Sequence, residues 1–136
     1  IETIIVDDGS TDDFSILKLQ QLKATYQFKL IEITNSGLAN ARNAGAKIAA
    51  GKYLTFLDPD DKTEPDYYQR AVDILKSKKN VCFVGCWAKY FEGSKNIWPA
   101  FTPEPPYILY HNMINSSALL YIRESFIQNG LNDYAL

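Results

Sequence analysis

Apolar runs and helix-like segments alternate along the first ninety positions of the chain. Three mostly apolar runs are expected to be strands, at residues 1–6, 28–33 and 53–57, and the first and the third are expected to be buried. Three segments with small or apolar residues at helical spacing are expected to be helices, at residues 14–26, 38–50 and 65–80. Parallel sheets with crossover helices require such alternation. The pattern therefore predicts an α/β fold of three layers, α/β/α, around a mostly parallel central sheet.

The chain changes character after residue 80. Residues 81–91 form a long apolar run that predicts one more strand, whereas residues 98–106 contain too many prolines for a regular element. A short helix, a strand and a helix ended by a glycine are expected in the remainder, at residues 107–113, 117–122 and 123–128. In the proline-rich loop, Trp98 and Phe101 either stack on a sugar or base ring or pin the loop to the core.

Composition limits the classes of protein to which this chain can belong. With 136 residues, of which 46% are hydrophobic and 22% charged, it fits one ordinary globular domain. A net charge of −2 argues against nucleic acid as a partner, because no basic excess is available to neutralise phosphates. No apolar stretch predicts a transmembrane segment or a signal peptide, so a cytoplasmic protein is expected. Cys82 and Cys86 lie roughly 13 Å apart if they share a strand, too far for a disulfide, and are expected to be buried.

Two acidic loops follow predicted strands. One begins at Asp7 and Asp8, and the other contains Asp58, Asp60 and Asp61. If the two strands are parallel neighbours, both loops lie at the edge of the sheet where α/β folds bind ligands. Clustered carboxylates repel one another unless a cation relieves them, and Mg²⁺ or Mn²⁺ prefer oxygen ligands. The loops thus indicate a nucleotide-diphosphate site that lacks a glycine-rich phosphate loop; the alternative is that the second loop only caps the following helix.

Four motifs occur together in a recognisable order. They are DDGSTD at residues 7–12, NSGLANARNAG at 35–45, GKY at 51–53 and DPDD at 58–61. Through these motifs the chain resembles the inverting family 2 glycosyltransferases, which have the Rossmann-like GT-A fold. A looser similarity continues at Asn112 and at residues 117–119 and 130–133.

The resemblance implies roles for individual residues. The expected nucleotide-sugar site consists of Asp7, Asp8, Gly9, Asn35, Gly37, Arg42, Asp58 and Asp60. Asp7 or Asp8 would bind the base, Asp58 the ribose, and Asp60 with Asp61 a divalent cation, Mn²⁺ or Mg²⁺, that bridges the diphosphate. Arg42 either lies near the nucleotide or tethers its helix to a loop.

The resemblance also divides the chain. Residues 1–92 would form the nucleotide-sugar-binding half of a single GT-A domain, and residues 93–136 the start of the acceptor side. The acceptor-side candidates are Trp98, Asn112 and Asp133. Compared with the family, the first strand is missing and the catalytic base is expected beyond Leu136, so the domain looks truncated and is expected to lack turnover by itself.

The activity implied by the resemblance is metal-dependent transfer, with inversion, from a nucleotide-diphosphate sugar, most simply a UDP-sugar. The acceptor would be a glycan or a lipid-linked sugar of bacterial polysaccharide or lipopolysaccharide synthesis, at the cytoplasmic face of a membrane if the full protein associates with one peripherally. Two alternatives stay open. One is a non-catalytic nucleotide-sugar-binding domain. The other is a phosphorelay receiver domain, whose Lys-Pro-like turn has only Lys89, followed by Tyr90, as a candidate.

Overall fold

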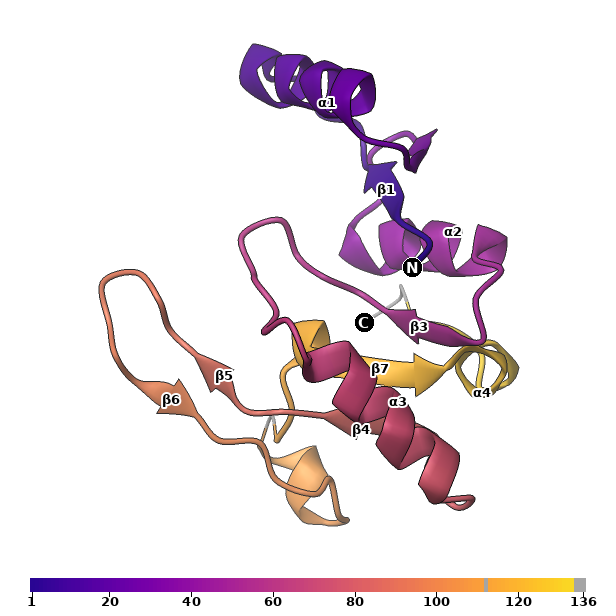
Figure 1. The fold of residues 1–136 in the computed structure, drawn as a ribbon, viewed down its shortest axis with the longest axis vertical. Coiled ribbons are helices and arrows are strands. Elements are labelled where there is room, and N and C mark those ends of the chain that lie inside the picture. The colour runs from indigo at the N-terminus through magenta and orange to yellow at the C-terminus, as the bar shows by residue number, and fades with distance from the viewer. Residues whose placement is uncertain (112, 134–136) are drawn as a thin grey trace. The chain divides into compact units, whose positions relative to one another are not determined.

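The computed structural model describes residues 1–111 and 113–133 of the 136-residue chain (Figure 1). The chain divides into two compact units. The first comprises Ile1–Lys52 and Phe126–Leu136, and the second comprises Tyr53–Ser125. The bounds of these units differ from those of the expected functional halves, residues 1–92 and 93–136. The functional halves stay a prediction. Each unit is described by itself below.

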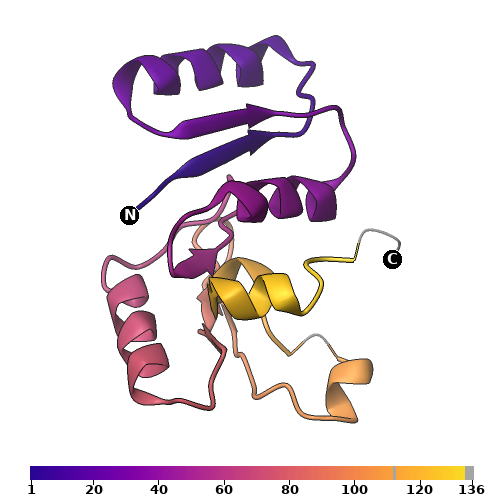
Figure 2. The same cartoon turned by 90° about the vertical axis from the view of Figure 1, so that its right-hand side faces the viewer.

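The first unit contains a parallel pair of strands with two helices. The strands are β1 (Ile4–Asp7) and β2 (Lys29–Glu32), and the helices are α1 (Asp13–Thr25) and α2 (Leu38–Ile48). The strands pair in register from Ile4 opposite Lys29 to Asp7 opposite Glu32, and Figure 2 shows both arrows pointing the same way. The predicted αβ order and the parallel direction are confirmed here.

Local signals in the sequence explain both helices of this unit. Asp12 caps α1, because its Oδ1 accepts a hydrogen bond of 2.8 Å from the Ser15 amide, and this bond lowers the pKa of the carboxyl. Small residues let α2 approach β1 closely. Ala46 is fully buried, and a Cβ on Gly45 would lie 3.2 Å from Cγ2 of Val6. The small-residue face predicted for this helix is therefore confirmed.

The second unit has a three-stranded sheet covered by one helix. Its strands are β3 (Tyr53–Thr55), β4 (Phe83–Gly85) and β7 (Leu119–Ile122), and the helix is α3 (Tyr67–Ser77). Ala71 and Leu75 of α3 pack with Leu120 of β7 in a buried cluster, surrounded by half-buried residues that include Tyr68 and Val72. The apolar residues whose helical spacing predicted this helix thus form its buried face.

The order of strands in this sheet was not predicted. Strand β7 lies between β3 and β4 and runs antiparallel to both, so β3 and β4 point the same way but are not hydrogen-bonded to each other (Figure 1). Only the β1–β2 pair is parallel among the pairs of the described residues. The expected mostly parallel strand pairing is therefore corrected for this sheet. Its middle strand, β7, comes late in the sequence and is antiparallel to the two strands beside it.

The segment after α3 also differs from expectation. The single strand expected over residues 81–91 is two, β4 and β5 (Ala88–Lys89), and β5 pairs with β6 (Ile97–Trp98) as a hairpin. Trp98 therefore belongs to a strand and not to the irregular loop. The last short elements are two 3₁₀ helices and one α-helix, η1 (Tyr107–Leu109), η2 (Ser116–Ala118) and α4 (Arg123–Gln128).

The break in the predicted strand also exposes one of the two cysteines. Cys82 is exposed and Cys86 is half-buried, and both are free thiols, so the burial expected for Cys82 is wrong.

Among the described residues, none of the helices has both the length and the hydropathy that crossing a bilayer requires.

Candidate functional site

Asp8 links the two loops of the first unit that carry most of the predicted site. Its Oδ1 accepts hydrogen bonds from the Ser36 amide at 2.8 Å and the Ser36 hydroxyl at 3.3 Å, and its Oδ2 accepts one from the Gly37 amide at 2.8 Å. Both oxygens are therefore engaged within the protein. Because Gly37 is the N-cap of α2, the carboxylate also lies at the positive end of that helix.

Gly9 lets the two loops come into contact. It has a φ of 75°, and a Cβ at this position would lie 2.9 Å from the backbone nitrogen of Asn35. A side chain would be strained by the backbone angle and would clash with backbone as well. The structure thus brings together Asp8, Gly9, Asn35 and Gly37, four of the residues predicted for the site.

Asp7 differs from its neighbour. It is the last residue of β1, and its Oδ1 accepts one hydrogen bond of 2.9 Å from the Ser10 amide. Within the described part of the chain, no hydrogen bond engages its Oδ2. Of the two carboxylates that could bind a base, Asp7 is the one that retains an acceptor oxygen for a ligand.

Helix α2 continues this loop cluster with a run of polar residues. Arg42 is half-buried on it, and Asn40 donates a hydrogen bond of 2.9 Å from its amide to the Ser36 carbonyl oxygen. Asn43 is only 6% exposed and exchanges two hydrogen bonds of 2.9 Å with the backbone N–H and C=O of Asn132. Both the nitrogen and the oxygen of this buried amide thus help to hold a distant loop.

The loop held by Asn43 carries the acceptor-side candidate Asp133. Gly130 and Leu131 just before it both have positive φ angles, 97° and 68°. A leucine in this region costs on the order of 1 kcal/mol, and the bonds to Asn43 are the kind of restraint that keeps such a conformation. Asp133 itself is exposed at the end of this restrained segment.

The second acidic loop forms a tight turn in the second unit. The Asp61 amide donates a hydrogen bond of 3.0 Å to the Asp58 carbonyl oxygen, with Pro59 and Asp60 between them. Proline at the second position and aspartate at the third are typical of such turns. As a result Asp60 is exposed and Asp61 is half-buried.

Asp58 at the start of this turn is held by a residue far along the chain. Its Oδ2 accepts a hydrogen bond of 2.6 Å from the hydroxyl of Ser117, which is 5% exposed. The neighbouring Ala118 carbonyl accepts a hydrogen bond of 2.6 Å from the Tyr67 hydroxyl. Burial, with the adjacent Cys86 adding to it, raises the pKa of Tyr67 above its ordinary value, so this hydroxyl remains a donor.

The donor set of the DPDD turn decides what kind of cation site it could form. Among the described residues, no group of three or more His, Cys, Asp or Glu side chains is arranged to hold a metal. Asp60 and Asp61 nevertheless supply hard oxygen ligands on an accessible turn. Mg²⁺ is commonly bound by one or two carboxylates plus the phosphates of its substrate. The turn therefore fits an ion whose shell a diphosphate completes, and does not fit a preformed structural metal site.

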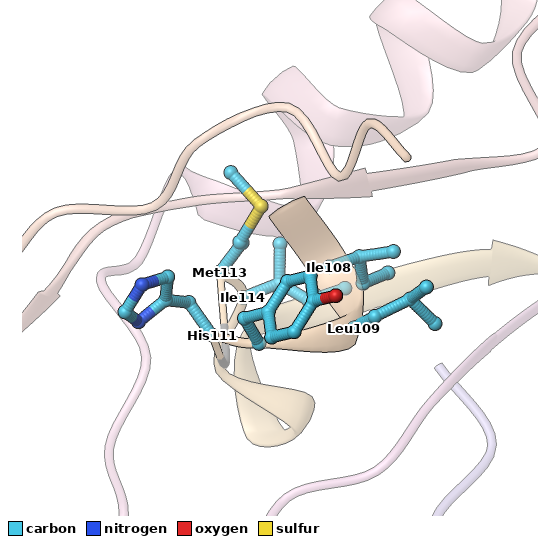
Figure 3. A pocket seen from close by; sticks show the side chains of 6 residues that line it. Ile108, Leu109, His111, Met113 and Ile114 are labelled. Carbon is cyan, nitrogen blue, oxygen red and sulfur yellow. The ribbon is translucent and has the colours of Figure 1, made fainter. Parts of the chain in front are cut away.

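The acceptor-side candidates are scattered. Trp98 is half-buried in β6, whereas Phe101 is 60% exposed, and Asn112 lies outside the described residues. A hollow of about 430 Å³ occurs nearby in the second unit (Figure 3), lined by Ile108, Leu109, Tyr110, His111, Met113 and Ile114. The imidazole of His111 lies across this hollow from Leu109. The described residues that line it include no carboxylate, so they offer no ligand for the cation of a metal-bound diphosphate.

Comparisons with known proteins give the family. The model described as "Glycosyl transferase family 2" matches residues 1–129. The chain belongs to this family. Its fold agrees as well, because the crystal structure of Staphylococcus aureus TarS (residues 1–349), determined in complex with UDP, superposes with a TM-score of 0.73. That superposition covers 99% of this chain and 41% of TarS at 23% identity.

Curated relatives of this glycosyltransferase family 2 chain are longer proteins. EpsH of Bacillus subtilis is 41% identical over 97 residues, which cover 71% of this chain and 28% of EpsH. YibD of Escherichia coli is 36% identical over 91 residues, which cover 61% of this chain and 26% of YibD. Both carry the name glycosyltransferase, and the chain matches about a quarter of their lengths. Family membership confirms the predicted class and sets aside the phosphorelay receiver alternative.

Three residues that organise the site were not singled out by the sequence. Asn43 could have been noticed as an amide in the middle of a small-residue helix, where a buried polar group implies a specific partner. Ser117 and Tyr67 carry no comparable signal, because their partners lie 59 and 51 positions away in the chain.

Proposed function

We propose that this chain is the nucleotide-sugar-binding part of an inverting, metal-dependent glycosyltransferase that uses a UDP-sugar. Family membership supplies the reaction class, and TarS, whose fold is similar, binds UDP in its crystal structure. The proposal extends that ligand to this chain through the acidic residues described above.

The observation that carries the proposal is the difference between Asp7 and Asp8. Asp8 has both oxygens committed to Ser36 and Gly37, whereas Asp7 keeps one carboxylate oxygen unengaged within the described residues. An ionised carboxylate accepts a hydrogen bond from the N–H of a uracil ring. In the proposed complex Asp7 binds the base, and Asp8 shapes the loop beside it.

The DPDD turn of the second unit carries the other residues with a proposed role. Asp58 would accept hydrogen bonds from the ribose hydroxyls, and Asp60 with Asp61 would hold a divalent cation, Mn²⁺ or Mg²⁺. When bound, such an ion neutralises the charge that develops on a departing diphosphate. The accessible DPDD turn supports this assignment, because two carboxylates are sufficient when phosphates complete the shell.

Calorimetric titration with UDP tests the donor assignment. In Mn²⁺ we expect binding that EDTA weakens by about tenfold or more, equivalent to about 1.4 kcal/mol. Asp60→Ala should lose the metal-dependent part of the affinity, whereas Asp73→Ala, an exposed carboxylate on α3, should retain it. Equal UDP affinity in EDTA and in Mn²⁺ would contradict the assignment.

The proposed reaction transfers the sugar to a saccharide or lipid-linked acceptor on the cytoplasmic side of a membrane. A carboxylate base would remove the proton of an acceptor hydroxyl as that oxygen attacks the anomeric carbon, and this direct displacement inverts the centre. Proton NMR of the transfer product tests the stereochemistry, and a retained configuration would refute it. UDP binding without transfer to any saccharide would instead favour the non-catalytic binding domain.

A further inference from the structure

The hydrogen bond between Ser117 and Asp58 is short, buried at one end and specific in its geometry. The Ser117 hydroxyl lies 2.6 Å from Oδ2 of Asp58, and Ser117 is 5% exposed. A distance of 2.5–2.7 Å is typical of a hydroxyl that donates to an ionised carboxylate, which is about twice as strong as a neutral hydrogen bond. The contact therefore orients one carboxylate oxygen of Asp58, the first residue of the DPDD turn.

The sheet brings these two residues together. In the antiparallel pair of β3 and β7, Tyr53 is opposite Ile122 and Thr55 is opposite Leu120. Asp58 follows the last paired residue of β3 by three positions, and Ser117 precedes Leu120 of β7 by three positions, within the 3₁₀ helix η2. The hydrogen bond thus joins the two segments that flank the ladder, and slippage of the strand register would break it.

Ser117 is fixed independently of Asp58. Its amide donates a hydrogen bond of 3.1 Å to Oδ1 of Asn115, the N-cap of η2. The following residue, Ala118, is held through its carbonyl by the Tyr67 hydroxyl on α3. Because the backbone on both sides of Ser117 is restrained, its side chain has little conformational freedom left to lose. Its hydroxyl can therefore hold the Asp58 carboxylate in one orientation.

We propose that Ser117 is the positioning residue that sets the selectivity of this site for ribose over deoxyribose. This rests on the proposed function, in which Asp58 accepts hydrogen bonds from the ribose hydroxyls of the donor. By fixing Oδ2 of Asp58, Ser117 aligns the carboxylate with the sugar. A site built to bind a hydroxyl discriminates against the analogue that lacks it, because the hydrogen bond between that hydroxyl and the protein is then lost.

The experiment compares UDP with 2′-deoxy-UDP, both titrated in Mn²⁺ by calorimetry. The wild-type protein should prefer UDP, and Ser117→Ala should reduce the ratio of the two dissociation constants by about fivefold to tenfold. Ser116→Ala removes the neighbouring exposed hydroxyl and should leave the ratio unchanged. Ser117→Thr keeps a hydroxyl and should restore the preference.

A double-mutant comparison separates positioning from general destabilisation. If Ser117 acts through Asp58, Ser117→Ala will not change the ratio further in an Asp58→Asn background. A thermal melt of each variant shows that the proteins compared are folded. If the alanine variant is not, Ser117→Cys takes its place, because a thiol is a side chain of similar size but a weak donor, and it should lower the ratio as well.

The outcomes distinguish this inference from the proposed function. No UDP binding by the wild-type protein would overturn both. UDP binding with a ribose preference that Ser117→Ala leaves unchanged would overturn only the role of Ser117. Equal weakening of UDP and 2′-deoxy-UDP would overturn it as well, because a merely structural residue affects both ligands alike.

Discussion

Replacing Asp8 by asparagine should destabilise the loop cluster of the first unit, whereas the same change at Asp7 should not. Asp8 accepts bonds of 2.8 Å from the amides of Ser36 and Gly37, one on each oxygen. Asparagine keeps one acceptor oxygen but presents an NH₂ group to the other amide, so one of the two bonds is lost and the other is no longer charge-assisted.

The magnitude follows from these contacts. Hydrogen bonds to charged groups contribute about 1.5–3 kcal/mol, and because Ser36 and Gly37 are exposed to water the loss is about 1–2 kcal/mol. The negative charge at the N-terminus of α2 (Leu38–Ile48) adds about 0.3–1 kcal/mol. Asp7 accepts a single bond, from Ser10, which an asparagine oxygen can still accept. Asp7→Asn should therefore change the free energy of unfolding by about 0.5 kcal/mol or less.

Two measurements check this prediction. Urea unfolding followed by circular dichroism gives the free energy of unfolding of each variant. Hydrogen exchange reports locally, and the amides of Ser36 and Gly37 should exchange faster in Asp8→Asn but not in Asp7→Asn. UDP affinity should show the opposite order, with Asp7→Asn more strongly affected. Equal losses of stability in both variants would refute the division of roles between Asp7 and Asp8.

Two further predictions concern the backbone and the alkaline range. Gly9→Ala should destabilise the protein by about 1–2 kcal/mol more than Gly93→Ala. Both glycines have similar positive φ angles, 75° and 72°, but of the two only Gly9 has backbone, that of Asn35, where a Cβ would lie. Calorimetric melts measure the difference, and equal losses of stability would contradict it. Burial raises the pKa of Tyr67 above its ordinary value of 10.0, so above about pH 10 the unfolded chain loses a proton that the folded chain keeps, and the free energy of unfolding falls. Tyr67→Phe should flatten this decline in urea unfolding at pH 9 to 11, and an unchanged slope would contradict the assignment.

The sequence by itself determined the features whose causes are local. The small residues of α2, such as Ala46, and the apolar face of α3 at Ala71 and Leu75 follow from spacings within a few turns of a helix. The acidic loops were located in the same way, since each comes directly after a strand.

Only the tertiary structure decided which strand lies next to which and which residue holds each carboxylate. Strand β7 is inserted between β3 and β4, and this order alone places Ser117 against Asp58. The partners of Asp8 lie 28 and 29 positions away. Hydrogen bonds between distant segments leave no periodicity in the sequence, because any strand with a suitable apolar face can complete a sheet. The residues of the candidate site were therefore predicted as a set, but which groups hold each of them within the protein depends on contacts that form only when the chain folds.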